Sequence, residues 1–186
     1  MTTRGKASRG VVVVDVINHF EFPDGDKILR SALQVAPNLR RLLARARREE
    51  VPIIYVNDNF GQWRSDAARM LAYCLRPEAP GRKFVEQVRP LPEDYFVLKP
   101  KHSAFYQTPL ETLLSYLKID AIVLCGLTTH SCIACSAHDA NMRDLGVVVV
   151  SDACAARTQV EHRHALELLA GLGNCRVIRS RSLAFR

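Results

Sequence analysis

The chain has 186 residues, of which 48% are hydrophobic and 24% charged, and its formal net charge is +7. These values are typical of one globular domain and exclude a disordered chain. No apolar run approaches the roughly 18 residues of a membrane-spanning helix. Residues 1–10 are too polar for a secretory signal. We therefore expect a cytoplasmic protein with one domain over residues 1–186, in which residues 1–9 form a flexible tail.

The positive charge does not by itself predict a nucleic-acid partner. Its densest run, residues 40–48, lies within a stretch with amphipathic helical spacing, so we interpret it as a solvated helix face. The first apolar run is not followed by a glycine-rich phosphate-binding motif, and the chain has no Walker loop. We predict a small-molecule substrate, which the net positive charge would attract to a cleft. We predict neither a nucleic-acid nor a membrane partner.

The six cysteines are expected to be reduced, because several lie in apolar runs and no secretory signal precedes them. Cys132 and Cys135 form a C-x-x-C pattern, which also occurs in redox pairs. Here the pattern comes late in the chain, and we expect Cys135 to pack on the buried face of its helix.

Short apolar runs rich in β-branched residues predict six strands, at residues 10–16, 51–56, 95–98, 121–125, 147–151 and 175–178. Apolar spacing and capping residues predict five helices, at residues 31–50, 65–75, 109–117, 131–145 and 160–172. Pro77, Pro80 and Gly81 indicate a loop. Because strands and helices alternate, the expected fold class is α/β, with a mostly parallel six-stranded sheet between helices on both faces.

Sites in such folds form beyond the carboxyl ends of the strands, and three of these ends carry reactive groups. Asp15 follows the first strand, Lys99 the third, and Cys132 lies just after the fourth. A thiol at a helix N-terminus beside a lysine is a nucleophile whose thiolate is favoured. A nearby carboxylate can take the thiol proton and later activate water. Taken alone, Cys132 would more often be a core thiol, Asp15 a strand-end carboxylate and Lys99 a surface lysine. The hypothesis of a catalytic site therefore depends on all three side chains lying close together.

The motifs around these residues resemble those of the isochorismatase-like cysteine hydrolases. Residues 12–20, VVVDVINHF, are similar to the family's apolar strand followed by D-x-Q-N-D-F. Residues 98–105, LKPKHSAF, are similar to K-x-x-x-S-A-F, and residues 126–133, GLTTHSCI, to G-x-x-T-x-x-C-V. The three matches occur in the family's order and cover residues 11 to about 155.

The resemblance implies a Rossmann-like three-layer α/β/α fold and a catalytic triad of Asp15, Lys99 and Cys132. It also implies a cis peptide between Leu127 and Thr128, which turns the backbone N–H groups of residues 128 and 132 toward the substrate oxygen as an oxyanion hole. Assembly as a homodimer or homotetramer is implied as well.

The sequence departs from the family pattern at His19 and Ile17, where Asp and Gln are common, and neither position belongs to the triad. Nicotinamidases carry histidine metal ligands after the second strand. Residues 56–63 contain none. We therefore predict no cofactor and no metal site. Isochorismatases that cleave a vinyl ether lack the cysteine, so Cys132 favours acyl chemistry.

The resulting hypothesis is a cysteine-dependent hydrolase that cleaves a small amide, carbamoyl or ureido substrate through a thioester. The alternative is a catalytically silent member of the same fold that acts as a binding or interaction protein. Five residues are expected to line the substrate pocket: Asn18, Phe20, Trp63, Phe105 and His130.

Overall fold

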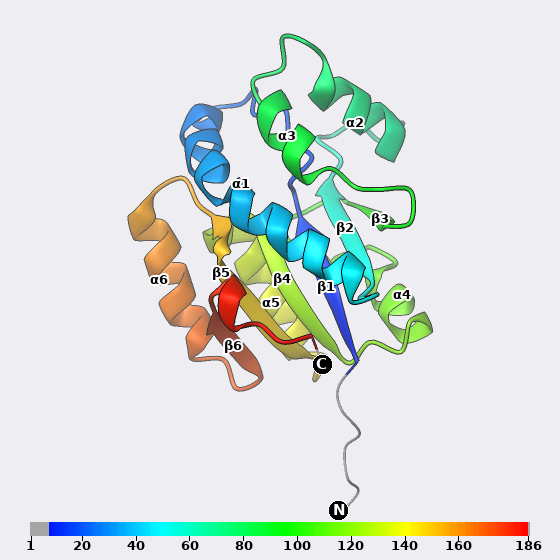
Figure 1. Ribbon diagram of the computed structural model, residues 1–186, viewed down its shortest axis with the longest axis vertical. Helices are drawn as coiled ribbons and strands as arrows, with labels where there is room; N and C mark the ends of the chain where they lie inside the picture. Colours follow the sequence, from blue (N-terminus) through cyan, green and yellow to red (C-terminus); the bar gives the residue numbers. More distant parts are fainter. Residues whose placement is uncertain (1–7, 186) are drawn as a thin grey trace, which may run out of the picture.

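The computed structural model describes residues 8–185, which form an α/β fold around one parallel sheet (Figure 1). The strand order is β3-β2-β1-β4-β5-β6, and every pair is parallel. The strands are β1 (Arg9–Val14), β2 (Ile53–Asp58), β3 (Tyr95–Lys99), β4 (Ala121–Leu127), β5 (Gly146–Ala155) and β6 (Cys175–Ile178). The predicted fold class and the six predicted strands are confirmed.

Helices cover both faces of the sheet: α1 crosses one face, and α5 lies behind the other (Figure 1). The α-helices are α1 (Gly25–Arg48), α2 (Ala67–Leu75), α3 (Arg82–Val88), α4 (Leu110–Tyr116), α5 (Ala134–Asn141) and α6 (Gln159–Ala170). A π-helical turn, η1 (Thr129–Ile133), precedes α5, and a 3-10 turn, η2 (Ser180–Ser182), follows β6. This two-sided cover explains why the central strands are apolar at every position rather than alternating.

Two helices differ from the sequence prediction. Helix α1 begins at Gly25 instead of residue 31, because its first turn contributes little to the apolar stripe that marked the helix. Helix α3 had no predicted element, and it buries Phe84, Val85 and Val88. The loop residue Gly81 directly precedes it, where a Cβ would come 2.2 Å from the carbonyl oxygen of Asn18.

The chain start and the segment after β4 also differ from expectation. The expected tail, residues 1–9, lies partly outside the described residues, but Arg9 already belongs to β1 and the Ser8 carbonyl accepts a bond from Ala121. The single helix expected at residues 131–145 is instead η1 followed by the shorter α5. Cys135 is exposed rather than packed on the buried face.

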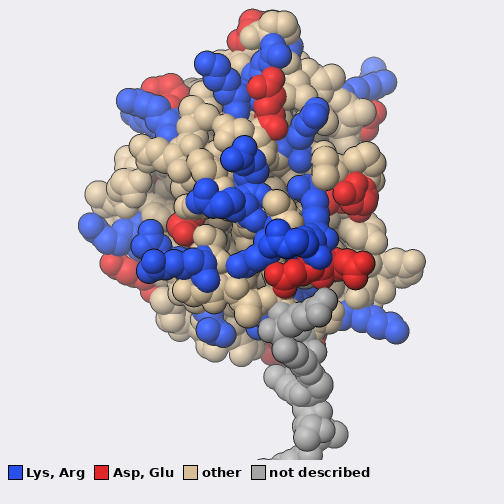
Figure 2. Space-filling model, viewed as in Figure 1, with Lys and Arg blue, Asp and Glu red and all other residues tan. Residues whose placement is uncertain are grey.

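Basic side chains gather over α1 on the face shown in Figure 2. The last turn of α1 carries Arg45, Arg47 and Arg48, where positive charge complements the negative end of the helix dipole. Among the described residues, no helix combines the length and apolar character needed to span a membrane.

The tightest backbone approach in the sheet lies where β1 meets β4, at Gly126. Gly126 pairs with Val14, has a φ of +116°, and a Cβ there would come 2.1 Å from the Val14 carbonyl oxygen. The register between β4 and β5 also shifts at this point. Only glycine fits this position, which leads directly into the turn before Cys132.

We predict that Gly126→Ala lowers the free energy of unfolding by at least about 3 kcal/mol, because the methyl group overlaps backbone and the φ is unfavourable. Urea denaturation followed by circular dichroism measures this change. The control is Gly173→Ala, where a Cβ meets nothing within 4 Å. Equal stability of the two variants would contradict this reading of the β1–β4 contact.

Candidate active site

Asp15, Lys99 and Cys132 meet at the carboxyl edge of the sheet. The Lys99 Nζ lies 2.9 Å from Asp15 Oδ2 and 3.5 Å from Cys132 Sγ. Lys99 is 0% exposed, Asp15 6% and Cys132 9%. A lysine that the sequence alone would place at the surface is therefore fully buried, with its ammonium group between a carboxylate and a thiol.

The strand register explains how these residues meet. Val14, directly before Asp15, pairs with Val56 on one side and Gly126 on the other, while Lys99 pairs with Asp58. Strand β3 lies two positions from β1, a separation of about 10 Å, which a lysine side chain and a carboxylate span together. The lysine crosses the end of β2, where its Nζ passes 3.5 Å from Asp58 Oδ2.

Backbone and side-chain bonds fix the carboxylate. Asp15 has a φ of +53°, and its Oδ1 accepts a bond of 2.7 Å from the Asp58 N–H. The buried Asn57 side chain holds the chain just beyond it, accepting from the Ile17 N–H and donating to the Ile17 carbonyl, both at 2.9 Å. The loop after β1 is thus tied to the end of β2.

Burial has the largest single effect on the pKa of each of the three groups. It raises the pKa of Asp15 despite the nearby Lys99 charge, which makes the carboxylate a better proton acceptor. The pKa of Lys99 is also raised, because attraction to Asp15 and Cys132 outweighs the burial that opposes it.

Burial and the Asp15 charge raise the pKa of Cys132 to about 12, and Lys99 only partly offsets this. The resting thiol is therefore protonated, and the Asp15 charge acts on it directly. The expectation of a favoured thiolate is wrong for the resting state, because Cys132 lies inside η1 rather than at a solvated helix end.

The turn that carries Cys132 contains a cis peptide bond between Leu127 and Thr128. The buried Thr129 hydroxyl lies 2.7 Å from His162 Nδ1, and the His162 ring also bonds the backbone of Ser151. Burial lowers the pKa of His162, so its imidazole is neutral near pH 7. A neutral ring that donates to the Ser151 carbonyl accepts from Thr129, and this links α6 to η1.

A cavity of about 730 Å³ is lined in part by Lys99, whereas Asp15 and Cys132 lie behind the lysine and are not among its lining residues. Its wall combines ends of β2 and β3 with the loops that follow them, and it includes Asp58, Trp63, Lys101 and Gln107. Trp63 is 79% exposed, so its ring stands at the rim of the cavity.

The other expected pocket residues occupy different places. Phe20 is buried and its ring packs edge-on against Phe84, with centroids 5.8 Å apart, so it belongs to the core. Phe105 is buried beneath the Arg143 guanidinium. Asn18 is buried and its Oδ1 accepts from the Phe20 N–H, which shapes the loop after β1. None of these three, nor the exposed His130, lines the cavity at Lys99.

Sequence reasoning missed His102, whose Nδ1 lies 3.8 Å from Cys132 Sγ and 3.2 Å from Ser131 Oγ. His102 lies within the K-x-x-x-S-A-F match, three residues after Lys99. Its closeness to Lys99 in the sequence was the one signal that could have identified it as a site residue. Asp58 was missed as well, although its position at a strand end was a usable signal.

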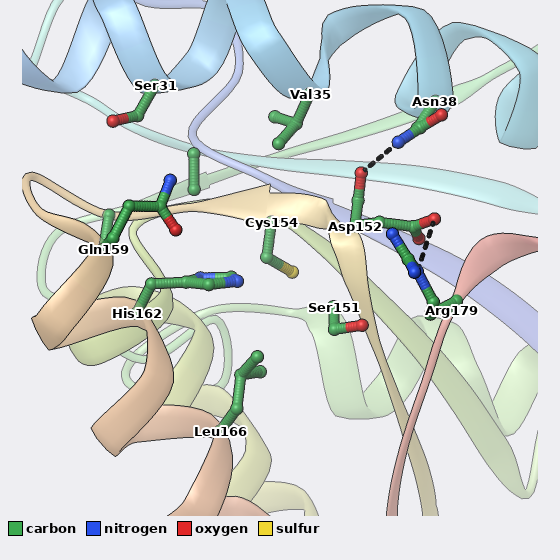
Figure 3. A pocket seen from close by; sticks show the side chains of 12 residues that line it. Ser31, Val35, Asn38, Ser151, Asp152, Cys154, Gln159, His162, Leu166 and Arg179 are labelled. Carbon is green, nitrogen blue, oxygen red and sulfur yellow. Dashed lines mark hydrogen bonds and ion pairs between the residues drawn. The ribbon is translucent and has the colours of Figure 1, made fainter.

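A second cavity, of about 330 Å³, lies between α1, β5 and α6 (Figure 3). His162 and Cys154 line it from α6 and β5, while Asn38 donates to the Asp152 carbonyl at 2.9 Å. The His162 ring therefore has this cavity beside it as well as the turn that carries Cys132. Within residues 8–185, no group of three or more His, Cys, Asp or Glu side chains is arranged to hold a metal ion.

Comparisons with known proteins point to one family. A family model described as the isochorismatase domain matches residues 9–182. The isochorismatase family protein YaaI of Bacillus subtilis is 34% identical over 164 residues, covering 88% of this chain and 90% of YaaI. N-carbamoylsarcosine amidase from Thermoplasma acidophilum is 27% identical with a TM-score of 0.69, over 95% of this chain and 98% of that chain. An isochorismatase family protein from Desulfovibrio vulgaris has a TM-score of 0.78 at 24% identity, over 95% of this chain and 96% of that chain. This similarity shows a shared fold.

The charges around the thiol predict opposite effects of two substitutions on alkylation of Cys132. Asp15 raises the thiol pKa and Lys99 lowers it. At a fixed pH between 7 and 9, Asp15→Asn should increase the thiolate fraction and speed alkylation by iodoacetamide, while Lys99→Met should slow it. Each pKa unit corresponds to about tenfold in rate.

The rates are measured for each cysteine by peptide mass spectrometry, and the exposed Cys135 is the internal reference in every variant. Slower alkylation of Cys132 in Asp15→Asn would contradict the electrostatic assignment.

The Thr129–His162 bond predicts a stability effect at the turn. Thr129→Val keeps the shape of the side chain but leaves the imidazole nitrogen without its partner. We expect a loss of about 1–3 kcal/mol in the free energy of unfolding, measured by urea denaturation. Thr112→Val, at an exposed position on α4, should change it by less than about 0.5 kcal/mol. If both variants match the wild type, the bond does not stabilise the turn.

Proposed function

We propose that this chain, which belongs to the isochorismatase family, is a cysteine-dependent hydrolase that cleaves a small amide, carbamoyl or ureido compound through a thioester intermediate. The observation that carries the proposal is the position of Lys99 Nζ, 2.9 Å from the Asp15 carboxylate and 3.5 Å from the Cys132 sulfur. The likeness to N-carbamoylsarcosine amidase over nearly the whole of both chains supports amide-type chemistry.

In the first half-reaction Asp15 takes the proton of the Cys132 thiol, and the sulfur attacks the substrate carbonyl carbon. The raised pKa of Asp15 favours this transfer, and Lys99 contacts both the carboxylate and the sulfur. Lys99 remains charged and offsets the negative charge that moves from carboxylate to sulfur. Collapse of the tetrahedral intermediate breaks the C–N bond, the leaving nitrogen takes up a proton from the solvent side, and a thioester remains on Cys132.

The oxyanion of that intermediate needs donors that are already in place. We assign this role to the backbone N–H groups of Thr128 and Cys132, on either side of the turn that follows the cis peptide. Loss of one such donor in other hydrolases costs about 3–4 kcal/mol of transition-state stabilisation. In the second half-reaction water attacks the thioester and releases one proton to the solvent side, which balances the proton taken up by the nitrogen. The sulfur leaves and takes back the proton held by Asp15.

The cavity that opens onto Lys99 is the proposed substrate site. Its wall offers amide and charged groups, including Asp58, Gln62, Lys101 and Gln107, with Trp63 at the rim. Such groups suit a polar compound with several hydrogen-bonding atoms, as amides and ureides are. Every covalent step uses side chains of this chain and water, so the proposed reaction requires no cofactor.

Replacement of the nucleophile and the base should abolish turnover. Cys132→Ala and Asp15→Asn are each expected to reduce hydrolysis by at least about 10³-fold, because one removes the covalent bond and the other the proton acceptor. Intact-protein mass spectrometry of the wild type, mixed with a panel of amides and ureides, should detect a thioester adduct on Cys132. The same panel supplies the substrate for kinetic assays.

Cys135→Ala is the matched control and should hydrolyse at the wild-type rate, because its thiol is exposed. Wild-type turnover by Cys132→Ala or Asp15→Asn would overturn the mechanism. Binding of panel compounds without adduct or hydrolysis would favour the silent binding protein instead.

A further inference from the structure

His102 is the third side chain that contacts the reactive sulfur. Lys99 Nζ reaches Cys132 Sγ at 3.5 Å from the buried side, and His102 Nδ1 reaches it at 3.8 Å. The His102 side chain is exposed, whereas Lys99 and Asp15 are buried. The Ser131 hydroxyl, 3.2 Å from the same ring nitrogen, holds the ring in place. The sulfur therefore has a buried ion pair on one side and an imidazole open to solvent on the other.

Asp15 and Lys99 are poorly placed to exchange protons with a group that enters or leaves through solvent, because both are buried. The Asp15 carboxylate has one oxygen bonded to the Asp58 N–H and the other paired with Lys99. The Lys99 ammonium contacts Asp15, Asp58, the Lys101 carbonyl and the Cys132 sulfur, which exhausts its three protons. The sequence suggested Asp15 as the activator of water, but this carboxylate is only 6% exposed and is paired with the buried lysine.

We propose that His102 is a further catalytic residue, which exchanges protons with the leaving nitrogen and with the hydrolytic water. This inference rests on the proposed hydrolase function. Asp15 then serves the sulfur alone, and His102 serves the atoms on the solvent side. An imidazole suits this task because it both accepts and donates a proton near neutral pH.

Protons are conserved over one catalytic cycle of acylation and deacylation. In acylation the thiol proton goes to Asp15, the C–S bond forms, and protonated His102 gives its proton to the nitrogen as the C–N bond breaks. In deacylation neutral His102 takes a proton from water, whose oxygen attacks the thioester carbon. The C–S bond breaks, Asp15 returns its proton to the sulfur, and the product leaves as the acid. Both side chains end as they began.

An activated ester separates the two half-reactions without knowledge of the natural substrate. p-Nitrophenyl acetate acetylates a nucleophilic cysteine and releases a nitrophenolate that needs no proton. With His102→Asn we expect a burst of nitrophenolate within about threefold of the wild-type rate. Deacylation should be slower by on the order of 10²-fold, so that acetylated Cys132 accumulates in intact-protein mass spectra.

Two further variants complete the experiment. His102→Ala should recover deacylation when imidazole is added, because the side chain is exposed and leaves an accessible space. His164→Asn, at an exposed position on α6, should match the wild type in both phases. The iodoacetamide rate of Cys132 in His102→Asn checks that the site remains folded.

The outcomes separate the two claims. A wild-type burst followed by wild-type deacylation in His102→Asn, or the absence of imidazole rescue, would overturn the role of His102 and leave the hydrolase proposal standing. If the wild type gives neither a burst nor an acetyl adduct on Cys132, the proposed function fails, and the role of His102 fails with it.

Discussion

The ion pair between Lys99 and Asp15 constrains the rest of the site. Each charge would cost several kcal/mol to bury alone, so each must be matched where it lies. The Lys99 ammonium contacts the carboxylates of Asp15 and Asp58 and the Lys101 carbonyl. The Asp15 carboxylate accepts from the Asp58 N–H and is paired with Lys99. The pair limits where the thiol can lie and which group can accept its proton. It also ties the ends of β1, β2 and β3 together, so the chemistry and the stability of this edge depend on the same contacts.

The sheet places the pair through its register, and two local features complete the arrangement. Gly126 lets β4 approach β1 so closely that no side chain fits between them. The turn after it then leads into η1, where Cys132 lies among buried atoms rather than at a solvated helix end. Thr129 and His162 hold this turn from the side opposite the nucleophile. The cysteine is therefore positioned by three elements, β1, β4 and α6, that are distant in the sequence.

The sequence predicted the strands well, because each buried parallel strand is a short apolar run, and it predicted that Asp15, Lys99 and Cys132 follow strand ends. It could not predict contacts that depend on the path between strands. Helix α3 has only seven residues and lacks a long periodic pattern, so the sequence predicted no element there. Phe20 was assigned to the pocket because it follows Asp15, yet its backbone turns the ring into the core. His102 approaches the sulfur only because the chain after β3 folds back over η1, which spacing alone does not reveal.

The protonated resting thiol follows from the same burial that positions it, and it bears on how the enzyme can be selective. A solvated thiolate reacts with many electrophiles, whereas a thiol whose pKa is raised to about 12 is largely inert at neutral pH. Proton transfer to Asp15 becomes favourable only when the charge that develops on the substrate oxygen is stabilised at the same moment. A compound that fails to place its carbonyl oxygen against the turn around Thr128 therefore meets a neutral sulfur. Under the proposed mechanism the oxyanion donors would therefore select the substrate as well as accelerate its cleavage, since they are coupled to the proposed nucleophile through one buried proton.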